Sequence, residues 1–273
     1  MPEPLPHPVA DSHCHLDMAP DPDRYGPGLS LEVALQYAEG VGVSRVVQIG
    51  CDLPGARWAV AASGKDARVV AGVALHPNEA PRLADRGELH DAFAVIEELA
   101  SHPRVRAIGE TGLDHFRTGA SGHSAQEQSF RWHIDLAKRT NKALVIHDRD
   151  AHDDVVRVLL EEGPPERVIF HCFSGDERLA GICSDHGWVM SFAGTVTFKT
   201  AEAVRSGLKA APLDLLLVET DAPYLTPTPF RGRPNSSYLI PHTVRAMSQV
   251  KGVEEAELCA SIDATTTRIF GSW

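Results

Sequence analysis

The sequence predicts an α/β fold of the (β/α)8 TIM-barrel type, with a single domain over residues 1–273 that ends in two C-terminal helices. Eight apolar runs of strand length recur between residues 9 and 223, and segments with helical periodicity separate them. Several runs are nearly continuous in Val, Ile, Leu and Ala, as expected for parallel strands that are buried on both faces. Eight strand–helix units suit such a barrel. A doubly wound open sheet would show the same alternation and stays open as an alternative.

The expected strands share their apolar character and their length. They cover residues 9–17, 43–51, 69–77, 105–114, 142–149, 168–175, 188–196 and 215–223. Helices are expected between them at residues 31–42, 91–102, 153–162 and 201–210. A Pro-rich loop follows the eighth strand at residues 222–241, and two further helices are expected at 242–251 and 254–270.

A further helix is expected in the segment SAQEQSFRWHIDLAKRT. Phe130, Ile134 and Ala137 occupy positions i, i+4 and i+7, which places them on one face of a helix. Ser124 and Glu127 have the spacing of a capping box, so the helix is expected to begin at Ser124.

The composition is that of an acidic protein with a sizeable core. The formal net charge is −11, which argues against a partner held mainly by a broad basic surface, although bound cations would add positive charge. Five cysteines form no CxxC pair, so we expect no disulfide framework and a reducing compartment. We find no signal peptide and no apolar run long enough for a membrane span. We therefore expect a cytoplasmic location and no membrane association, and the sequence implies no protein partner.

Polar residues gather where the expected strands end. Six of the eight runs close with a polar motif: DSHCHLD, HP, GETGLD, HDR, HCFSG and ETDAP. In a TIM-type barrel the C-terminal ends of the strands meet at one end of the molecule, where catalytic residues lie. The motifs therefore predict a functional site there.

The first motif offers a pair of imidazoles. His13 and His15 are two residues apart, so both point to the same side of a strand. Two neutral imidazoles on one side can bind a metal, and the alternative is two histidines bonded to the backbone. Asp11 and Asp17 flank them, either as carboxylates that orient the imidazoles or as turn residues.

Four other strand ends add candidate ligands. Glu110 follows an apolar strand and can bridge two cations, the alternative being a buried ion pair. His147 and His171 each end a buried strand, where a core histidine is the alternative. Asp221 follows the run LLLVET, and a charged group there must be paired or coordinated. Six candidate ligands at corresponding positions of five strands favour a metal site.

Two residues are candidates for substrate binding. His76 ends the third strand and is followed by a proline, so substrate contact and a polar cap are both open. Arg149 is two residues beyond His147 and can hold a phosphate with two hydrogen bonds, or form an ion pair with Asp150 or Asp153. Arg231 and Arg233 lie in the loop after the eighth strand, where they either meet an anionic substrate or are solvated.

Together the motifs resemble the TatD family of metal-dependent deoxyribonucleases, within the amidohydrolase-like superfamily. DSHCHLD, GVALHP, IGETGLD, IHDR, HCFSG and VETDAPYL occur in this order over about residues 9–271. The resemblance implies a divalent metal site with six ligands: His13, His15, Glu110, His147, His171 and Asp221. It also implies hydrolysis of DNA phosphodiesters, typically as a 3′–5′ exonuclease that depends on Mg or Mn.

The sequence departs from the family pattern at three places. His115 stands where family members commonly carry tyrosine, and His133 stands where they commonly carry glutamine. The loop commonly written RNEP is RPNSS here (residues 233–237), so its glutamate is missing. None of these is a proposed ligand, and the loop change bears on substrate preference.

The expected mechanism uses one or two divalent ions (Mg, Mn or Zn, with others possible), with Glu110 shared between them. Such ions lower the pKa of bound water, and Asp221 takes its proton as the general base. The expected substrate is DNA, as a single strand or an end.

The main alternative is an amidohydrolase or lactonase, or an aminoacyl-RNA deacylase, that acts on a small ester or amide at the same site. A non-catalytic protein with a structural metal is a further alternative, although structural zinc sites are generally rich in cysteine.

Overall fold

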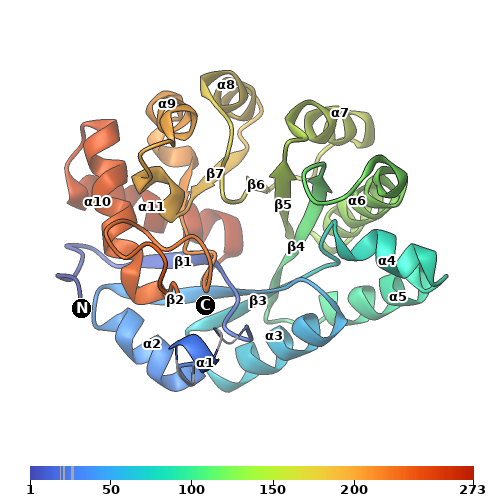
Figure 1. Cartoon of the computed structure of the whole chain (residues 1–273), viewed down its shortest axis with the longest axis horizontal. Coiled ribbons are helices and arrows are strands. Elements are labelled where there is room, and N and C mark those ends of the chain that lie inside the picture. Colours follow the sequence, from blue (N-terminus) through green and yellow to red (C-terminus); the bar gives the residue numbers. More distant parts are fainter. Residues whose placement is uncertain (19, 21, 26–27) are drawn as a thin grey trace. The chain divides into compact units, whose positions relative to one another are not determined.

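The structure is a computed structural model that describes residues 1–18, 20, 22–25 and 28–273. Strands and helices alternate along the chain (Figure 1), and eight strands follow one another in the sheet in chain order. The pairings of β1 with β2, β3 with β4, β4 with β5, β5 with β6 and β7 with β8 are all parallel. The predicted α/β fold of the (β/α)8 class is confirmed.

The strands lie where the apolar runs predict them. They are β1 (Val9–Cys14), β2 (Val43–Gly50), β3 (Val69–Val73), β4 (Val105–Asp114), β5 (Ala143–Arg149), β6 (Val168–Phe170), β7 (Val189–Phe192) and β8 (Leu216–Val218). The helices are α1 (Pro22–Tyr25), α2 (Leu31–Glu39), α3 (Leu53–Lys65), α4 (Glu79–Asp85), α5 (Leu89–Ala100), α6 (Ala120–Thr140), α7 (His152–Glu162), α8 (Glu177–Asp185), α9 (Glu202–Ala210), α10 (Ile240–Lys251) and α11 (Glu255–Phe270). Three 3₁₀ turns are η1 (Gly194–Thr197), η2 (Leu213–Leu215) and η3 (Ser237–Leu239).

The chain divides into two compact units. Unit 1 contains Met1–Gln48 and Cys172–Ser272, and unit 2 contains Ile49–His171 together with Trp273. The single domain over residues 1–273 stays a prediction.

Unit 1 contains the first and last strands of the chain. β1 pairs with β2, β7 pairs with β8, and an isolated bridge joins Cys14 to Ala222 just beyond β8. Helix α11 packs on β1 and on β8, so the expected C-terminal helices cover strands of this unit. Side-chain caps fix two helix starts, because Ser30 accepts from Val33 N at α2 and Asp176 accepts from Leu179 N at α8.

Unit 2 contains the strands from β3 to β6. β4 pairs with β3 on one side and with β5 on the other, and β5 also pairs with β6. Helix α6 packs on β4 and α3 packs on β3. Asn141 caps the C-terminus of helix α6, and its φ of 50° is a left-handed conformation that asparagine tolerates.

Two details differ from the sequence predictions. The strands β3, β6 and β8 end before their polar motifs and β1 ends inside its motif, so His15, His76, His171 and Asp221 lie in the loops just beyond the strands. The predicted capping box is wrong, because α6 begins at Ala120 and Glu127 lies inside the helix. There its carboxylate accepts hydrogen bonds from Arg131 and Arg157, and an ion pair on a helix surface has replaced the expected cap. Within the described parts of the chain, none of the helices has the length and apolar character that a bilayer span requires.

Candidate metal-binding clusters

In unit 1, three of the predicted ligands come together, and we call them the unit-1 cluster: His13, His15 and Asp221. His13 Nε2 lies 3.3 Å from His15 Nε2, and Asp221 Oδ1 lies 3.2 Å from His15 Nε2 and 3.9 Å from His13 Nε2. Both imidazoles are buried, whereas the Asp221 side chain is 17% exposed. The carboxylate therefore lies at the side of the cluster that solvent can reach.

The main chain of two strand ends brings these ligands together. His13 and His15 are two residues apart, which places both rings on one side of β1 as the sequence predicts. The backbone N–H of Asp221 donates to His13 O (2.9 Å), and the N–H of His15 donates to Ala222 O (2.8 Å). Asp221 has a φ of 54°, a left-handed conformation that aspartate adopts more readily than most residues. This bend turns its side chain toward the imidazoles.

A buried carboxylate, Asp11, holds the backbone around the unit-1 cluster. It accepts hydrogen bonds from the N–H and the hydroxyl of Thr220, from the hydroxyl of Ser237 and from the N–H of His13. Burial raises the pKa of Asp11 to about 6, against the lowering effect of these hydrogen bonds. Asp11 therefore fixes the ends of both strands that carry the ligands.

The loop that departs from the family pattern takes part in the same network. Ser237 donates to Asp11, and the Asn235 amide donates to the carbonyl oxygens of Thr220 (2.9 Å) and Tyr224 (2.7 Å). The residues of RPNSS thus stabilise the backbone on either side of Asp221. Sequence reasoning did not predict this role.

Gln48 is another supporting residue that sequence reasoning missed. Its side chain accepts from Leu16 N (2.6 Å) and donates to Asp17 Oδ1 (2.6 Å), so it fixes the segment just after His15. The available signal was a polar residue inside the apolar run VVQIG, which is fully buried in the structure.

In unit 2, four side chains form what we call the unit-2 cluster: His76, Glu110, His147 and His171. Glu110 Oε1 lies 2.5 Å from His147 Nδ1, 2.8 Å from His171 Nε2 and 3.4 Å from His76 Nε2. One carboxylate oxygen therefore faces three imidazoles. The sequence predicted Glu110, His147 and His171 as ligands, whereas His76 was predicted only as a substrate contact or a cap.

A second carboxylate orients His147. Asp114 Oδ2 lies 3.3 Å from His147 Nε2, and Asp114 also accepts from the Asn78 amide and from Arg117 N. Burial acts to raise the pKa of Asp114, but these hydrogen bonds outweigh it and hold the pKa well below its usual value. Burial acts to lower the pKa of His147, but Glu110 and Asp114 outweigh it and raise that pKa. The nitrogen that faces Glu110 is then the one available to a cation.

Two more side chains support the unit-2 cluster, one by contact with Glu110 and one by contact with the backbone next to His76. The Cys51 thiol donates to Glu110 Oε2 (3.4 Å), whereas Oε1 of the same carboxylate faces His76, His147 and His171. His133 Nε2 accepts from Leu75 N (3.2 Å), next to His76, and its Nδ1 donates to Ser129 O (2.7 Å). Burial lowers the pKa of His133 to about 4, so this imidazole is neutral at pH 7.

Arg149 does not form the ion pair that was its alternative role. Its guanidinium lies 4.0 Å from the ring centroid of Phe116, whose side chain is 63% exposed. The N–H of His115 donates to Arg149 O (3.0 Å), so the backbone next to Phe116 is fixed as well. Substrate binding by Arg149 stays a prediction.

The donor sets fit a divalent cation. A cation about 2.1 Å from each ligand atom holds its ligands about 3.0–3.4 Å apart in tetrahedral or octahedral geometry. In the unit-1 cluster two of the three separations between donor atoms fall in this range. In unit 2, His76, Glu110 and His147 offer donor atoms that all lie within 4.8 Å of one another. Mixed imidazole and carboxylate ligands suit Zn, Mn and related metals.

Comparison with known proteins agrees with this chemistry. The model of the TatD related DNase family matches residues 10–271. A protein of Mycobacterium tuberculosis named uncharacterized metal-dependent hydrolase TatD is 44% identical over 269 residues, which are 96% of this chain and 98% of that protein. The uncharacterized metal-dependent hydrolase YabD of Bacillus subtilis is 35% identical and covers 95% of this chain and 98% of its own length. The crystal structure of YJJV, a TatD homolog from Escherichia coli, is 24% identical with a TM-score of 0.85, covers 96% and 97% of the two chains, and has the same fold.

Proposed function

Because the chain belongs to the TatD related DNase family and is a metal-dependent hydrolase, we propose that it cleaves the phosphodiester bonds of DNA. The proposed substrate is a single strand or a strand end, degraded from 3′ to 5′. The observation that carries the proposal is the pair of imidazole–carboxylate clusters, since such ligands suit the divalent cations on which hydrolysis of phosphodiesters depends.

The side chains of the two clusters have separate tasks in this proposal. His13, His15 and Asp221 would hold a cation in unit 1, while Glu110, His147 and His171 would do so in unit 2. A bound divalent cation lowers the pKa of water and neutralises charge on phosphoryl oxygens. The sharing of Glu110 between two cations stays a prediction.

Asp221 is the proposed general base. It is the most exposed member of the unit-1 cluster, and its carboxylate lies beside His15, where it would accept a proton from the attacking water. His76 and Arg149 are the proposed contacts to the phosphate, because both lie at strand ends of unit 2 and carry donors that suit an anion. No covalent enzyme intermediate is required, since the nucleophile comes from solvent.

The proposal is tested with metal-stripped protein on single-stranded DNA that carries a label at its 5′ end, with Mg, Mn and Zn added separately. We expect no cleavage without metal and, with metal, a ladder of labelled products that shorten from the 3′ end. Immediate release of a labelled mononucleotide would instead show 5′–3′ polarity.

Parallel assays separate the competing activities. Lactones, N-acyl amino acids and aminoacyl-RNA are offered to the same preparations, with the Asp221→Ala variant as the control for contaminating nucleases. Turnover of one of these substrates together with intact DNA in every metal would contradict the proposal and favour the ester or amide hydrolase.

A further inference from the structure

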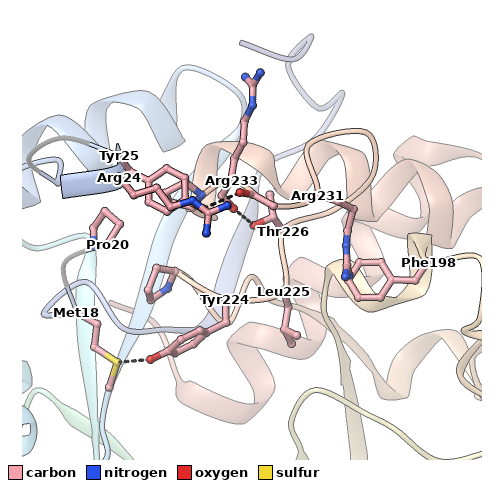
Figure 2. A pocket seen from close by; sticks show the side chains of 13 residues that line it. Met18, Pro20, Arg24, Tyr25, Phe198, Tyr224, Leu225, Thr226, Arg231 and Arg233 are labelled. Carbon is pink, nitrogen blue, oxygen red and sulfur yellow. Dashed lines mark hydrogen bonds between the residues drawn. The ribbon is translucent and has the colours of Figure 1, made fainter. Parts of the chain in front are cut away.

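A cleft in unit 1 lies beside the unit-1 cluster and has no part in the mechanism above. Its volume is about 470 Å³, within the usual range of small-ligand pockets. The segment after β1, with Met18 and Tyr25, forms one side of it, and the loop after β8, residues 223–234, forms another (Figure 2).

Three arginines give this cleft its charge. Arg24, Arg231 and Arg233 line it, and the described residues of the lining include no Asp or Glu, although the whole chain has a net charge of −11. The Arg231 guanidinium lies 3.5 Å from the ring centroid of Phe198, which fixes its position (Figure 2). Guanidinium groups stay charged at all relevant pH values. A ligand with several anionic groups, such as a phosphate chain, matches this lining.

Two tyrosines give the cleft aromatic surface. The side chain of Tyr224 is 53% exposed, and its hydroxyl donates to Met18 Sδ (3.4 Å), which limits the motion of the ring. The hydroxyl of Tyr25 donates to Gly232 O (2.7 Å) and ties the segment after β1 to the loop after β8. An exposed aromatic ring beside arginines is the usual arrangement for stacking unpaired bases.

Tyr224 connects the cleft to the proposed catalytic residues. Its N–H donates to Asp221 O (2.9 Å), and its ring centroid lies 6.5 Å from that of His15 in an edge-on arrangement. A strand with one phosphate at the unit-1 cluster therefore has its neighbouring nucleotide at Tyr224.

We propose that this arginine–tyrosine cleft binds the nucleotide next to the scissile phosphate of a single-stranded nucleic acid. Tyr224 stacks on its base, while Arg231, with Arg24 and Arg233, binds the adjoining phosphates. The inference rests on the proposed function, because it assigns the substrate of the same site. Single strands are favoured over duplexes, since a paired base is not available for stacking.

Binding is measured by fluorescence anisotropy of a labelled oligothymidylate, in the metal-loaded Asp221→Ala background so that the strand is not consumed. Tyr224→Ala is expected to weaken binding roughly 10-fold or more, whereas Tyr224→Phe keeps the ring and stays within about twofold. Each of Arg231→Ala and Arg233→Ala is expected to reduce the slope of log K against log salt by about 0.7.

Arg82→Ala is the matched control, because it removes one positive charge from a side chain in unit 2 that is 70% exposed. It is expected to leave affinity and salt slope unchanged. Equal effects of all the arginine variants, or parent-like binding by Tyr224→Ala, would overturn the proposal.

Hydrolysis of bis(p-nitrophenyl) phosphate separates this inference from the proposed function. That diester has no nucleoside, so cleft variants that retain Asp221 should hydrolyse it at the parental rate. For the oligonucleotide, the KM of the same variants should rise about 10-fold. An equal loss on both substrates overturns the cleft assignment. If the parent protein hydrolyses neither the diester nor the oligonucleotide, the proposed function is overturned. The binding measurements then test the assignment of the cleft independently.

Discussion

The two clusters contain the same kinds of ligand but are held in different ways. In unit 1 the buried Asp11 carboxylate accepts hydrogen bonds from the main chain of both ligand-bearing segments, so backbone geometry fixes the ligands. In unit 2 the support acts on side chains, because Asp114 orients the His147 imidazole and Glu110 lies among three imidazoles. Ligand geometry therefore depends on backbone hydrogen bonds in unit 1 and on contacts between side chains in unit 2.

The largest expected effect distinguishes the tasks of the two clusters. Asp221→Ala should lower kcat by roughly 10²–10⁴-fold, because it removes the proposed general base, while most of the bound Mn is retained. Glu110→Ala should abolish turnover together with metal binding, since three imidazoles lose their common carboxylate. Metal content by atomic absorption, measured beside kcat, checks both. Wild-type rates for Asp221→Ala on several substrates would disprove its role.

The His133→Gln variant tests the contribution of the buried His133 to the pH dependence of stability. The pKa of His133 is about 4 in the folded protein against 6.5 for the ordinary side chain, so the unfolded chain binds more protons between these values. This contribution to stability is present above pH 6.5 and is lost as the pH falls from 6.5 to 4. The wild type should lose about 3 kcal/mol more than the glutamine variant between pH 7 and 4.

The free energy of unfolding of the wild type and of the His133→Gln variant is measured by urea denaturation at pH 7 and at pH 4. Glutamine can accept from Leu75 N and donate to Ser129 O, so the two proteins should have similar stability at pH 7. Parallel loss of stability in both proteins would show that another group causes the pH dependence.

Asp11→Ala tests the corresponding support in unit 1. It leaves the buried N–H groups of His13 and Thr220 without their acceptor, which should cost about 2 kcal/mol or more in the free energy of unfolding. Asp11→Asn keeps one acceptor oxygen and should recover part of the loss. Denaturant unfolding measures both variants, and an unchanged stability of Asp11→Ala would refute the role of Asp11.

A smaller effect is expected at Asp114. Asp114→Asn removes the carboxylate that orients His147 and should weaken binding of Mn by about 10- to 100-fold, measured by calorimetry. Asp148→Asn is the matched control, because Asp148 lies in the same strand as His147 but pairs with His152 (2.7 Å). Equal losses in the two variants would argue against a specific role for Asp114.

The smallest effect concerns Arg149, whose guanidinium stacks on Phe116. Arg149→Lys keeps the charge but loses the planar group, so KM for a phosphodiester should rise a few-fold while kcat stays constant. Steady-state kinetics check this split. A fall in kcat at constant KM would place Arg149 in the chemical step instead.

Much of the fold follows from local patterns in the sequence. Each apolar run contains a strand, and in β4 even the bounds agree, because runs of buried aliphatic residues identify strands that are covered on both faces. The polar motifs mark the strand ends, which is why all six predicted ligands lie in one cluster or the other. The start of α6 was predicted wrongly, because a capping-box spacing also occurs where Glu127 forms ion pairs inside a helix.

The sequence alone determined the positions of the strands along the chain, their alternation with helices and the residue types of the ligands, because periodicity and short motifs are local properties of the chain. The pairing of the strands in chain order decided for the predicted (β/α)8 class over a doubly wound open sheet. The tertiary structure decided how each ligand is held. Ser237 donates to Asp11, which is 226 positions away in the sequence, and His133 accepts from Leu75, which is 58 positions away. Only packing brings such partners together. The same holds for His76 beside Glu110, since a contact between residues distant in the chain leaves no periodic signal in the sequence.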